Sequence, residues 1–132
     1  MVMWRRFRVV RAHGFTLIEL IVVMAIIALL ISIVAPRYMR SLEKSKEAVL
    51  KQDLWVMRDA LDKYYGDLGK YPNSLDELVE QKYLRTIPVD PLTDSTSTWQ
   101  VVAPNDPELG AIYNVKSGAS GASTIGTSYS DW

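Results

Sequence analysis

The sequence contains no cysteine and only one histidine, and these two shortages exclude several kinds of site. Without cysteine there is no disulfide framework, no thiolate metal site and no cysteine nucleophile. The single histidine, His13, lies in an N-terminal segment that we expect to be removed, which excludes histidine-based catalysis and zinc binding. No glycine spacing matches a phosphate-binding loop, and the acidic residues are dispersed along predicted helix faces. We therefore expect that the chain is not an enzyme.

The chain also has no net charge, although its basic and acidic residues are unevenly distributed along the sequence. The 15 basic and 15 acidic side chains cancel, but residues 1–14 hold four arginines and no acid. Without those four arginines, 11 basic side chains face 15 acidic ones, a net charge of −4. A mildly acidic product gives no reason to expect nucleic-acid binding. The cluster belongs to the targeting end of the chain: Arg5, Arg6, Arg8 and Arg11.

Hydrophobic residues are concentrated in one long run, from Phe15 to Ala35, whose single ionisable side chain is Glu19. A helix of these 21 residues is roughly 30 Å long, which matches the hydrocarbon thickness of a bilayer. Apolar residues fill every face, which is typical of a membrane-spanning helix rather than an amphipathic one. Pro36 marks the end of this helix or a kink in it.

This run has two other interpretations. A cleaved secretory signal would need an apolar stretch of about 7–15 residues, and Pro36 gives a poor context for cleavage. A plain single-pass anchor leaves Glu19 unexplained, because a carboxylate near the centre of a span costs about 2.5–3.5 kcal/mol and less near an end. Glu19 either snorkels toward the headgroups or meets a cation from a partner chain. Basic residues lie on both sides of the span, so their count leaves its orientation open.

The run begins with a recognisable motif, Gly14-Phe15-Thr16-Leu17-Ile18-Glu19-Leu20, which follows a short basic leader. This motif resembles the prepilin peptidase site of type IV pilins and type II secretion pseudopilins. The resemblance implies cleavage after Gly14 on the cytoplasmic side and methylation of the new N-terminal Phe15. It implies that Glu19 pairs with the N-terminal ammonium of a neighbouring subunit, and that Pro36 is a helix-kinking proline. The expected segments are a leader at 1–14, a transmembrane and filament-core helix at 15–35, and a periplasmic head at 36–132.

After Pro36 an amphipathic pattern predicts that a helix continues from Arg37 to about Tyr65 and is ended by Gly66 and Gly69. One apolar stripe is expected to pack on a small head: Leu50, Leu54, Met57, Leu61, Tyr64 and Leu68. Opposite charges four residues apart are expected to pair on the solvated faces: Glu47–Lys51, Arg58–Asp62 and Asp59–Lys63.

The remaining residues predict one short helix and a pair of strands. Ser74-Leu75-Asp76-Glu77 has the form of a capping box and starts a helix to about Gln81. β-Branched and aromatic residues predict antiparallel strands at 98–103 and 111–116. Residues 117–130 are a Ser/Gly/Ala/Thr loop, which the rings of Tyr129 and Trp132 could pin to the head. The predicted class is α+β, with a long N-terminal helix packed on a small antiparallel sheet, as in type IV pilins.

The order of short motifs over the whole chain resembles the G-type major pseudopilin of type II secretion: Tyr71-Pro72, Asp90-Pro91, Tyr113-Asn114-Val115, Ser117-Gly118 and Trp132. The resemblance implies an inner-membrane protein with its leader in the cytoplasm and its head in the periplasm. The implied partners are prepilin peptidase, further copies of the chain, minor pseudopilins and the inner-membrane assembly platform. The alternative is a type IV pilus subunit that serves adhesion, motility or DNA uptake.

In one respect the chain departs from this family. Many G-type pseudopilins hold calcium in the last loop with several aspartates, whereas the segment after Pro104 offers only Asp106, Glu108 and Asp131. Calcium prefers six to eight oxygen ligands, usually including carboxylates. We therefore expect no cofactor and no tight calcium site, and the sequence leaves open whether a weak site exists.

Overall fold

The computed structural model describes residues 2–3, 8 and 12–132 of the chain. Arg5, Arg6 and Arg11 of the predicted leader lie outside the described residues, and Arg8 is exposed. The chain divides into two compact units, Met1–Arg37 and Tyr38–Trp132. The boundary between them lies close to Pro36 in the sequence, where the predicted head begins.

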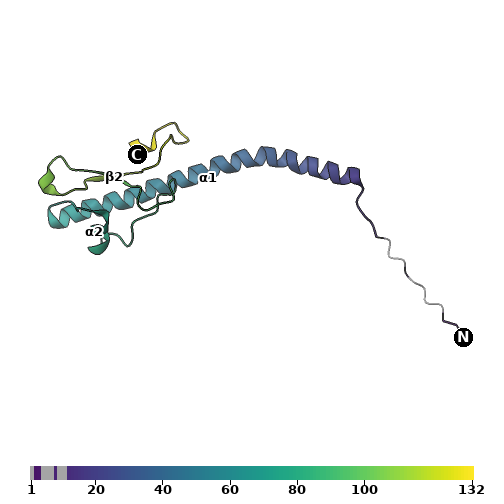
Figure 1. Cartoon of the computed structure of the whole chain (residues 1–132), viewed down its shortest axis with the longest axis horizontal. Coiled ribbons are helices and arrows are strands. Elements are labelled where there is room, and N and C mark those ends of the chain that lie inside the picture. Colours follow the sequence, from purple (N-terminus) through teal and green to yellow (C-terminus); the bar gives the residue numbers. More distant parts are fainter. Residues whose placement is uncertain (1, 4–7, 9–11) are drawn as a thin grey trace. The chain divides into compact units, whose positions relative to one another are not determined.

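The main element is helix α1, which spans Leu17–Leu68 (Figure 1). Its hydrogen-bonded pattern continues through Pro36, so the alternative in which the helix ends at this proline is wrong. A proline removes one backbone donor, and the apolar and long-chain residues on both sides are strong helix formers that sustain the helix around it. A kink at Pro36 stays a prediction.

The C-terminal end of α1 corrects another boundary. The helix passes through Gly66 and ends at Leu68, followed by Gly69 at a φ of 71°. The Gly69 N–H donates to the carbonyl of Tyr65 at 2.8 Å, which satisfies one of the carbonyls left free at a helix end. Gly69 alone therefore terminates the helix, because a left-handed residue is needed only at that position.

The core of the second unit is built on the predicted apolar stripe of α1. Leu50, Leu54, Met57, Leu61 and Tyr64 are buried, whereas Leu68 at the end of the helix is about half exposed. Each fully buried side chain of this kind contributes about 1.5–3 kcal/mol of hydrophobic free energy. Ala60 of the same helix and residues from later parts of the chain, three of them in loops, join the cluster: Leu78, Leu84, Trp99, Ile112, Val115 and Tyr129.

Helix α2, Leu75–Glu80, begins at the predicted capping box. Ser74 Oγ accepts a hydrogen bond from the Glu77 N–H at 3.3 Å, and Glu77 Oε2 accepts one from the Asn73 N–H at 2.7 Å. Glu77 Oε1 also accepts a bond from the Tyr64 hydroxyl at 2.7 Å. The cap therefore fixes the start of α2 and ties it to α1.

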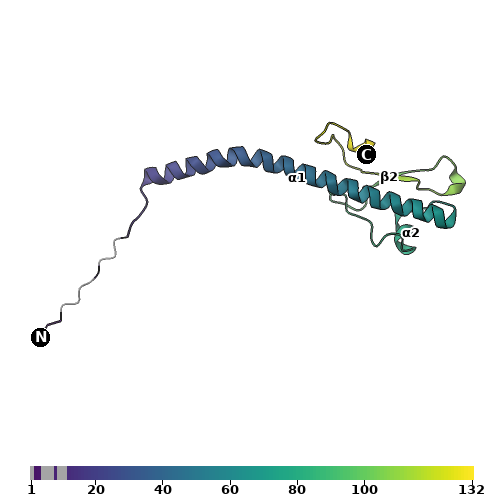
Figure 2. The same ribbon diagram turned by 180° about the vertical axis from the view of Figure 1, so that it is seen from behind.

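The sheet consists of two short antiparallel strands, β1 at Gln100–Val102 and β2 at Asn114–Lys116, in a register that pairs Val101 with Val115. One-turn 3₁₀ helices lie at Pro107–Leu109, between the strands, and at Tyr129–Asp131. In both views β2 lies on one side of the C-terminal half of α1 and α2 on the other (Figures 1 and 2). The predicted α+β class and strand pair are confirmed, with strands shorter than predicted.

Candidate functional site

The peptide bond between Gly14 and Phe15 lies just before α1, in non-helical chain. Both residues are exposed, Phe15 by 83%, and no heavy atom comes within 4 Å of a Cβ built on Gly14. A peptidase needs an accessible, non-helical backbone at the bond it cuts. The predicted cleavage position has both properties.

Thr16 caps the N-terminus of α1. Its Oγ1 accepts a hydrogen bond from the Glu19 N–H at 3.2 Å, and its carbonyl accepts one from the Leu20 N–H at 3.1 Å. Glu19 is exposed in the first helical turn, where a carboxylate gains about 0.3–1 kcal/mol from the helix dipole. Sequence reasoning misses Thr16, although Thr-x-x-Glu before an apolar run is the signature of a capping box.

Within the first unit, the apolar side chains of α1 are exposed on every face, from Leu17 to Val34. Among the described residues, α1 is the one helix long and apolar enough to cross a membrane, as judged by length and composition. A surface of this kind is stable only in lipid or against other apolar helices.

In the second unit, Glu47 holds the C-terminal loop against α1. This side chain is only 7% exposed, and its two carboxylate oxygens accept three hydrogen bonds from the loop. The donors are the N–H of Thr124 at 2.7 Å, the hydroxyl of Thr124 at 2.8 Å and the hydroxyl of Tyr129 at 2.9 Å. The buried carboxylate is therefore fully paired, which makes its burial tolerable.

The environment of Glu47 shifts its pKa in two opposing directions. Burial raises the pKa, whereas the hydrogen bonds from Thr124 and Tyr129 and the nearby charge of Lys51 lower it. Together, the effects that lower the pKa are larger than the effect of burial, so the pKa of Glu47 lies below its ordinary value. Burial raises the pKa of Tyr129, and its hydrogen bond to Glu47 raises it further.

Arg58 holds the loop at a second point, three turns further along α1. Its Nε donates to Asn114 Oδ1 at 2.8 Å, and its Nη2 donates to the main-chain oxygens of Val115 at 3.0 Å and Trp132 at 2.7 Å. The guanidinium thus joins α1, β2 and the last residue through charge-assisted bonds. Lys51 lies 4.7 Å above the ring of Trp132, a cation–π contact at the same end of the loop.

Of the three predicted ion pairs along α1, the structure has one and replaces the other two by contacts with later parts of the chain. Asp59 and Lys63 form an ion pair of 2.8 Å, as predicted. In the second unit, Glu47 does not form an ion pair with Lys51, and Arg58 does not form one with Asp62. Both side chains turn to the C-terminal loop, because buried hydrogen bonds are worth more than exposed i,i+4 ion pairs of about 0.3–0.5 kcal/mol.

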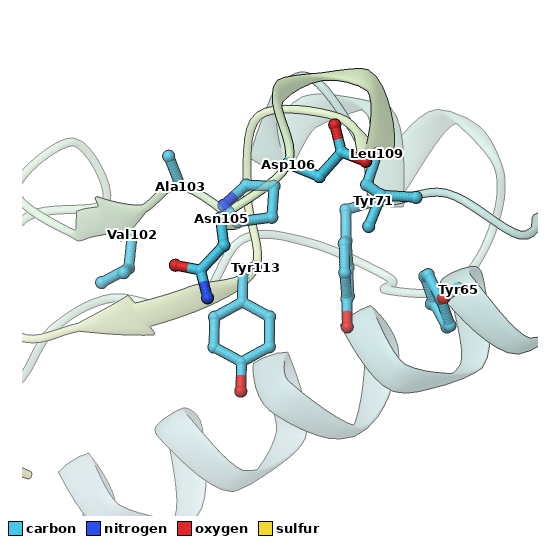
Figure 3. A pocket seen from close by; sticks show the side chains of 9 residues that line it. Tyr65, Tyr71, Val102, Ala103, Asn105, Asp106, Leu109 and Tyr113 are labelled. Atoms are coloured by element: carbon cyan, nitrogen blue, oxygen red, sulfur yellow. The ribbon is translucent and has the colours of Figure 1, made fainter.

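An aromatic groove of about 450 Å³ lies at the end of the head that holds the last turns of α1 (Figure 3). Tyr65 and Tyr71 stack with ring centroids 4.6 Å apart, and Tyr71 meets Tyr113 edge-on at 5.6 Å. Burial raises the pKa of Tyr71, with further contributions from its tyrosine neighbours. Asn105 and Asp106 line the groove, and it brings together no nucleophile and base, so its chemistry is that of a contact surface.

The three acids that the sequence offers for calcium do not converge. Asp106 Oδ1 accepts the Glu108 N–H at 2.9 Å and caps the first 3₁₀ helix, while Asp131 lies in the second. In the described part of the chain, no three acidic or histidine side chains form a group that could hold a metal ion.

Comparisons with known proteins bear on both units. Residues 10–35 match the family described as the prokaryotic N-terminal methylation motif. The type II secretion system core protein G of Klebsiella pneumoniae is 34% identical over 110 residues, which cover 71% of this chain and 76% of that protein. This chain belongs to the type II secretion system core protein G family.

Other core protein G relatives match in the same way. The protein of Escherichia coli K12 is 33% identical over 97 residues, 61% of this chain and 67% of that protein. The protein of Klebsiella michiganensis is 28% identical over 136 residues, 91% of this chain and 92% of that protein. No solved structure matches the chain. Family membership and the apolar half of α1 together indicate that the chain is anchored in a membrane.

Proposed function

We propose that the chain is made as a precursor, cut by prepilin peptidase between Gly14 and Phe15, and methylated on Phe15. Membership of the core protein G family makes it a structural subunit of the type II secretion pseudopilus. The observation that carries the proposal is the methylation motif at residues 10–35, within which the Gly14–Phe15 bond lies exposed just before α1.

Glu19 is proposed to guide assembly. In the filament it would pair with the N-terminal ammonium of a neighbouring subunit inside a bundle of apolar helices. Two opposite charges in such a dry environment are tolerable together and costly apart, since an uncompensated buried charge costs several kcal/mol. The exposed position of Glu19 in the first turn of α1 leaves its carboxylate available for this contact.

The proposed topology is the one that the family resemblance implies, because the basic residues on both sides of the span leave its orientation open. The leader lies in the cytoplasm, the apolar half of α1 crosses the inner membrane, and the head lies in the periplasm. Each subunit contacts the next head-to-tail without closing a ring, which produces an open helical filament. Minor pseudopilins and the inner-membrane assembly platform are the further partners, and extension of the filament drives exported proteins across the outer membrane.

The alternative function, a type IV pilus subunit, shares the same N-terminal features. None of the observations favours it, because the relatives described above are core proteins of secretion systems.

Processing can be tested by expressing the full chain with and without an active prepilin peptidase and measuring its intact mass and N-terminal sequence. We expect a product that starts at N-methylated Phe15, 14 residues shorter than the precursor, only when the peptidase is present. An uncut N-terminus with active peptidase, or a product that starts at Pro36, would contradict the proposal.

The assembly role of Glu19 is tested in the same system with Glu19→Gln, and Glu43→Gln serves as the control because Glu43 lies outside the apolar run. We expect both variants to be cut, and only Glu19→Gln to lose filaments in electron micrographs. Co-purification with secretion components supports the pseudopilus, whereas long surface fibres would support the pilus alternative.

A further inference from the structure

Several oxygen atoms of the C-terminal loop, residues 117–132, already accept hydrogen bonds from the protein. The main-chain oxygen of Thr127 accepts the Ser123 N–H at 2.7 Å, and that of Ser128 accepts the Asp131 N–H at 3.1 Å. Both oxygens of Glu47 accept hydrogen bonds from Thr124. The single carboxylate side chain of the loop is Asp131, so the loop itself offers few of the oxygen ligands that calcium requires.

Two cationic side chains also lie directly on this loop. Arg58 Nη2 donates to the main-chain oxygen of Trp132 at 2.7 Å, and Lys116 Nζ donates to that of Ser130 at 3.0 Å. Like charges within about 4–6 Å disfavour each other strongly in a partly buried setting. A divalent cation would therefore meet repulsion where the last residues are held. The oxygen atoms and charges of this loop therefore do not fit the calcium site that the family resemblance implies.

The contacts made by Glu47 and Arg58 fasten the loop to α1, which is the structural role that a bound metal would have there. Glu47 is an anion that accepts hydrogen bonds from the N–H and hydroxyl of Thr124, in the middle of the loop, and from the hydroxyl of Tyr129. Arg58 is a cation that donates to the main-chain oxygens of Val115, just before the loop, and of Trp132, its last residue. Both side chains project from α1, so the loop is fastened to the helix that carries the core of the head.

We propose that Glu47 and Arg58 form an internal clamp that replaces a calcium ion, so that the C-terminal loop of this chain is ordered without metal. The loop that they hold is the yellow segment beside α1 in Figure 1. This inference concerns the stability of the head and holds whether or not the chain forms filaments.

Hydrogen exchange measured by mass spectrometry on the full chain in detergent micelles tests the clamp. Wild type, Glu47→Gln and Glu43→Gln are compared with excess EGTA and with millimolar calcium chloride. Glu43 is the matched control, an exposed acid one turn earlier on α1. We expect amides of residues 118–130 to exchange about tenfold faster or more in Glu47→Gln, the effect of one lost charged hydrogen bond, and less than about twofold faster in Glu43→Gln.

Calcium and EGTA should give the same exchange rates in the wild-type loop. Calcium-dependent protection of that loop, or equal rates in Glu47→Gln and Glu43→Gln, would overturn the clamp. Peptides from α2 report whether the whole head unfolds. If exchange in the α2 peptides also rises in Glu47→Gln, the whole head is destabilised, and the Tm of wild type is then measured with and without EGTA. An unchanged Tm supports the clamp, and a Tm lowered by EGTA overturns it.

Discussion

The acid sensitivity of the head should depend on Glu47. The pKa of this carboxyl lies below its ordinary value of 4.5, because the hydrogen bonds of Thr124 and Tyr129 and the charge of Lys51 together outweigh the effect of burial. The pKa of Glu77 is lowered too, by the Asn73 N–H and the Tyr64 hydroxyl. A group whose folded-state pKa is lowered contributes stability that is fully present above its unfolded-state pKa and lost as the pH falls through its folded-state pKa.

The magnitude follows from proton linkage. At a pH between the folded-state and unfolded-state pKa values, each such carboxyl binds up to one more proton in the unfolded chain. The free energy of unfolding therefore falls by up to about 1.4 kcal/mol per pH unit for each group. Below pH 4.5, Glu47 and Glu77 should each make wild type lose stability as the pH falls, whereas Asp53, whose pKa is raised by burial and by the charge of Asp90, acts in the opposite direction. Glu47→Gln should have a shallower slope than wild type, because the contribution of Glu47 is removed while those of Glu77 and Asp53 remain.

The assay is urea unfolding of the full chain in detergent at a series of pH values from neutral to acid, followed by fluorescence. Trp99 is a suitable probe because it is buried and its indole N–H donates to the carbonyl of Pro88 at 2.8 Å. The titratable groups that act on Glu47 are Lys51 and Tyr129, and Glu43→Gln is the control because Glu43 is an exposed acid one turn earlier on α1 that accepts no hydrogen bond from Thr124. An acid slope in Glu47→Gln equal to that of wild type would refute the reasoning.

Two further substitutions test the packing of the head. Gly118→Ala should destabilise the head by roughly 1–3 kcal/mol in urea unfolding, because the new Cβ would lie 1.9 Å from the carbonyl oxygen of Thr98. Gly66→Ala should stabilise the head by roughly 1 kcal/mol, because Gly66 lies within α1 and the new Cβ would meet no atom within 4 Å. A stabilising Gly118→Ala together with a destabilising Gly66→Ala would contradict this description of the two sites. The hydrogen bond to Glu77, with burial, raises the pKa of Tyr64 to about 12. Tyr64→Phe should therefore remove the highest-pH step from a tyrosine absorbance titration, and loss of a lower step instead would refute this environment.

Periodicity and turn chemistry predicted much of the fold. The stripe from Leu50 to Tyr64 repeats at steps of three and four, and burial of that face is what a repeat of this kind requires. The cap at Ser74 and the antiparallel strands followed from local residue preferences. Boundaries were less predictable, because a helix can pass through Gly66 or Pro36 when the residues on both sides favour it.

The contacts that fasten the C-terminal loop could not be predicted from local sequence patterns. They join residues far apart in the chain: Glu47 and Thr124 are separated by 77 positions, and Arg58 and Trp132 by 74. A spacing of four between Glu47 and Lys51 satisfies the rule for an exposed helix pair, and the rule gives no sign of a distant competitor. One signal was nevertheless present. Glu47 lies three residues before Leu50, in line with the apolar stripe, and a buried acid in such a position needs partners from another segment. The sequence assigned only ring contacts to the tail, although its hydroxyl groups, such as those of Thr124 and Tyr129, are donors that a buried acid could use.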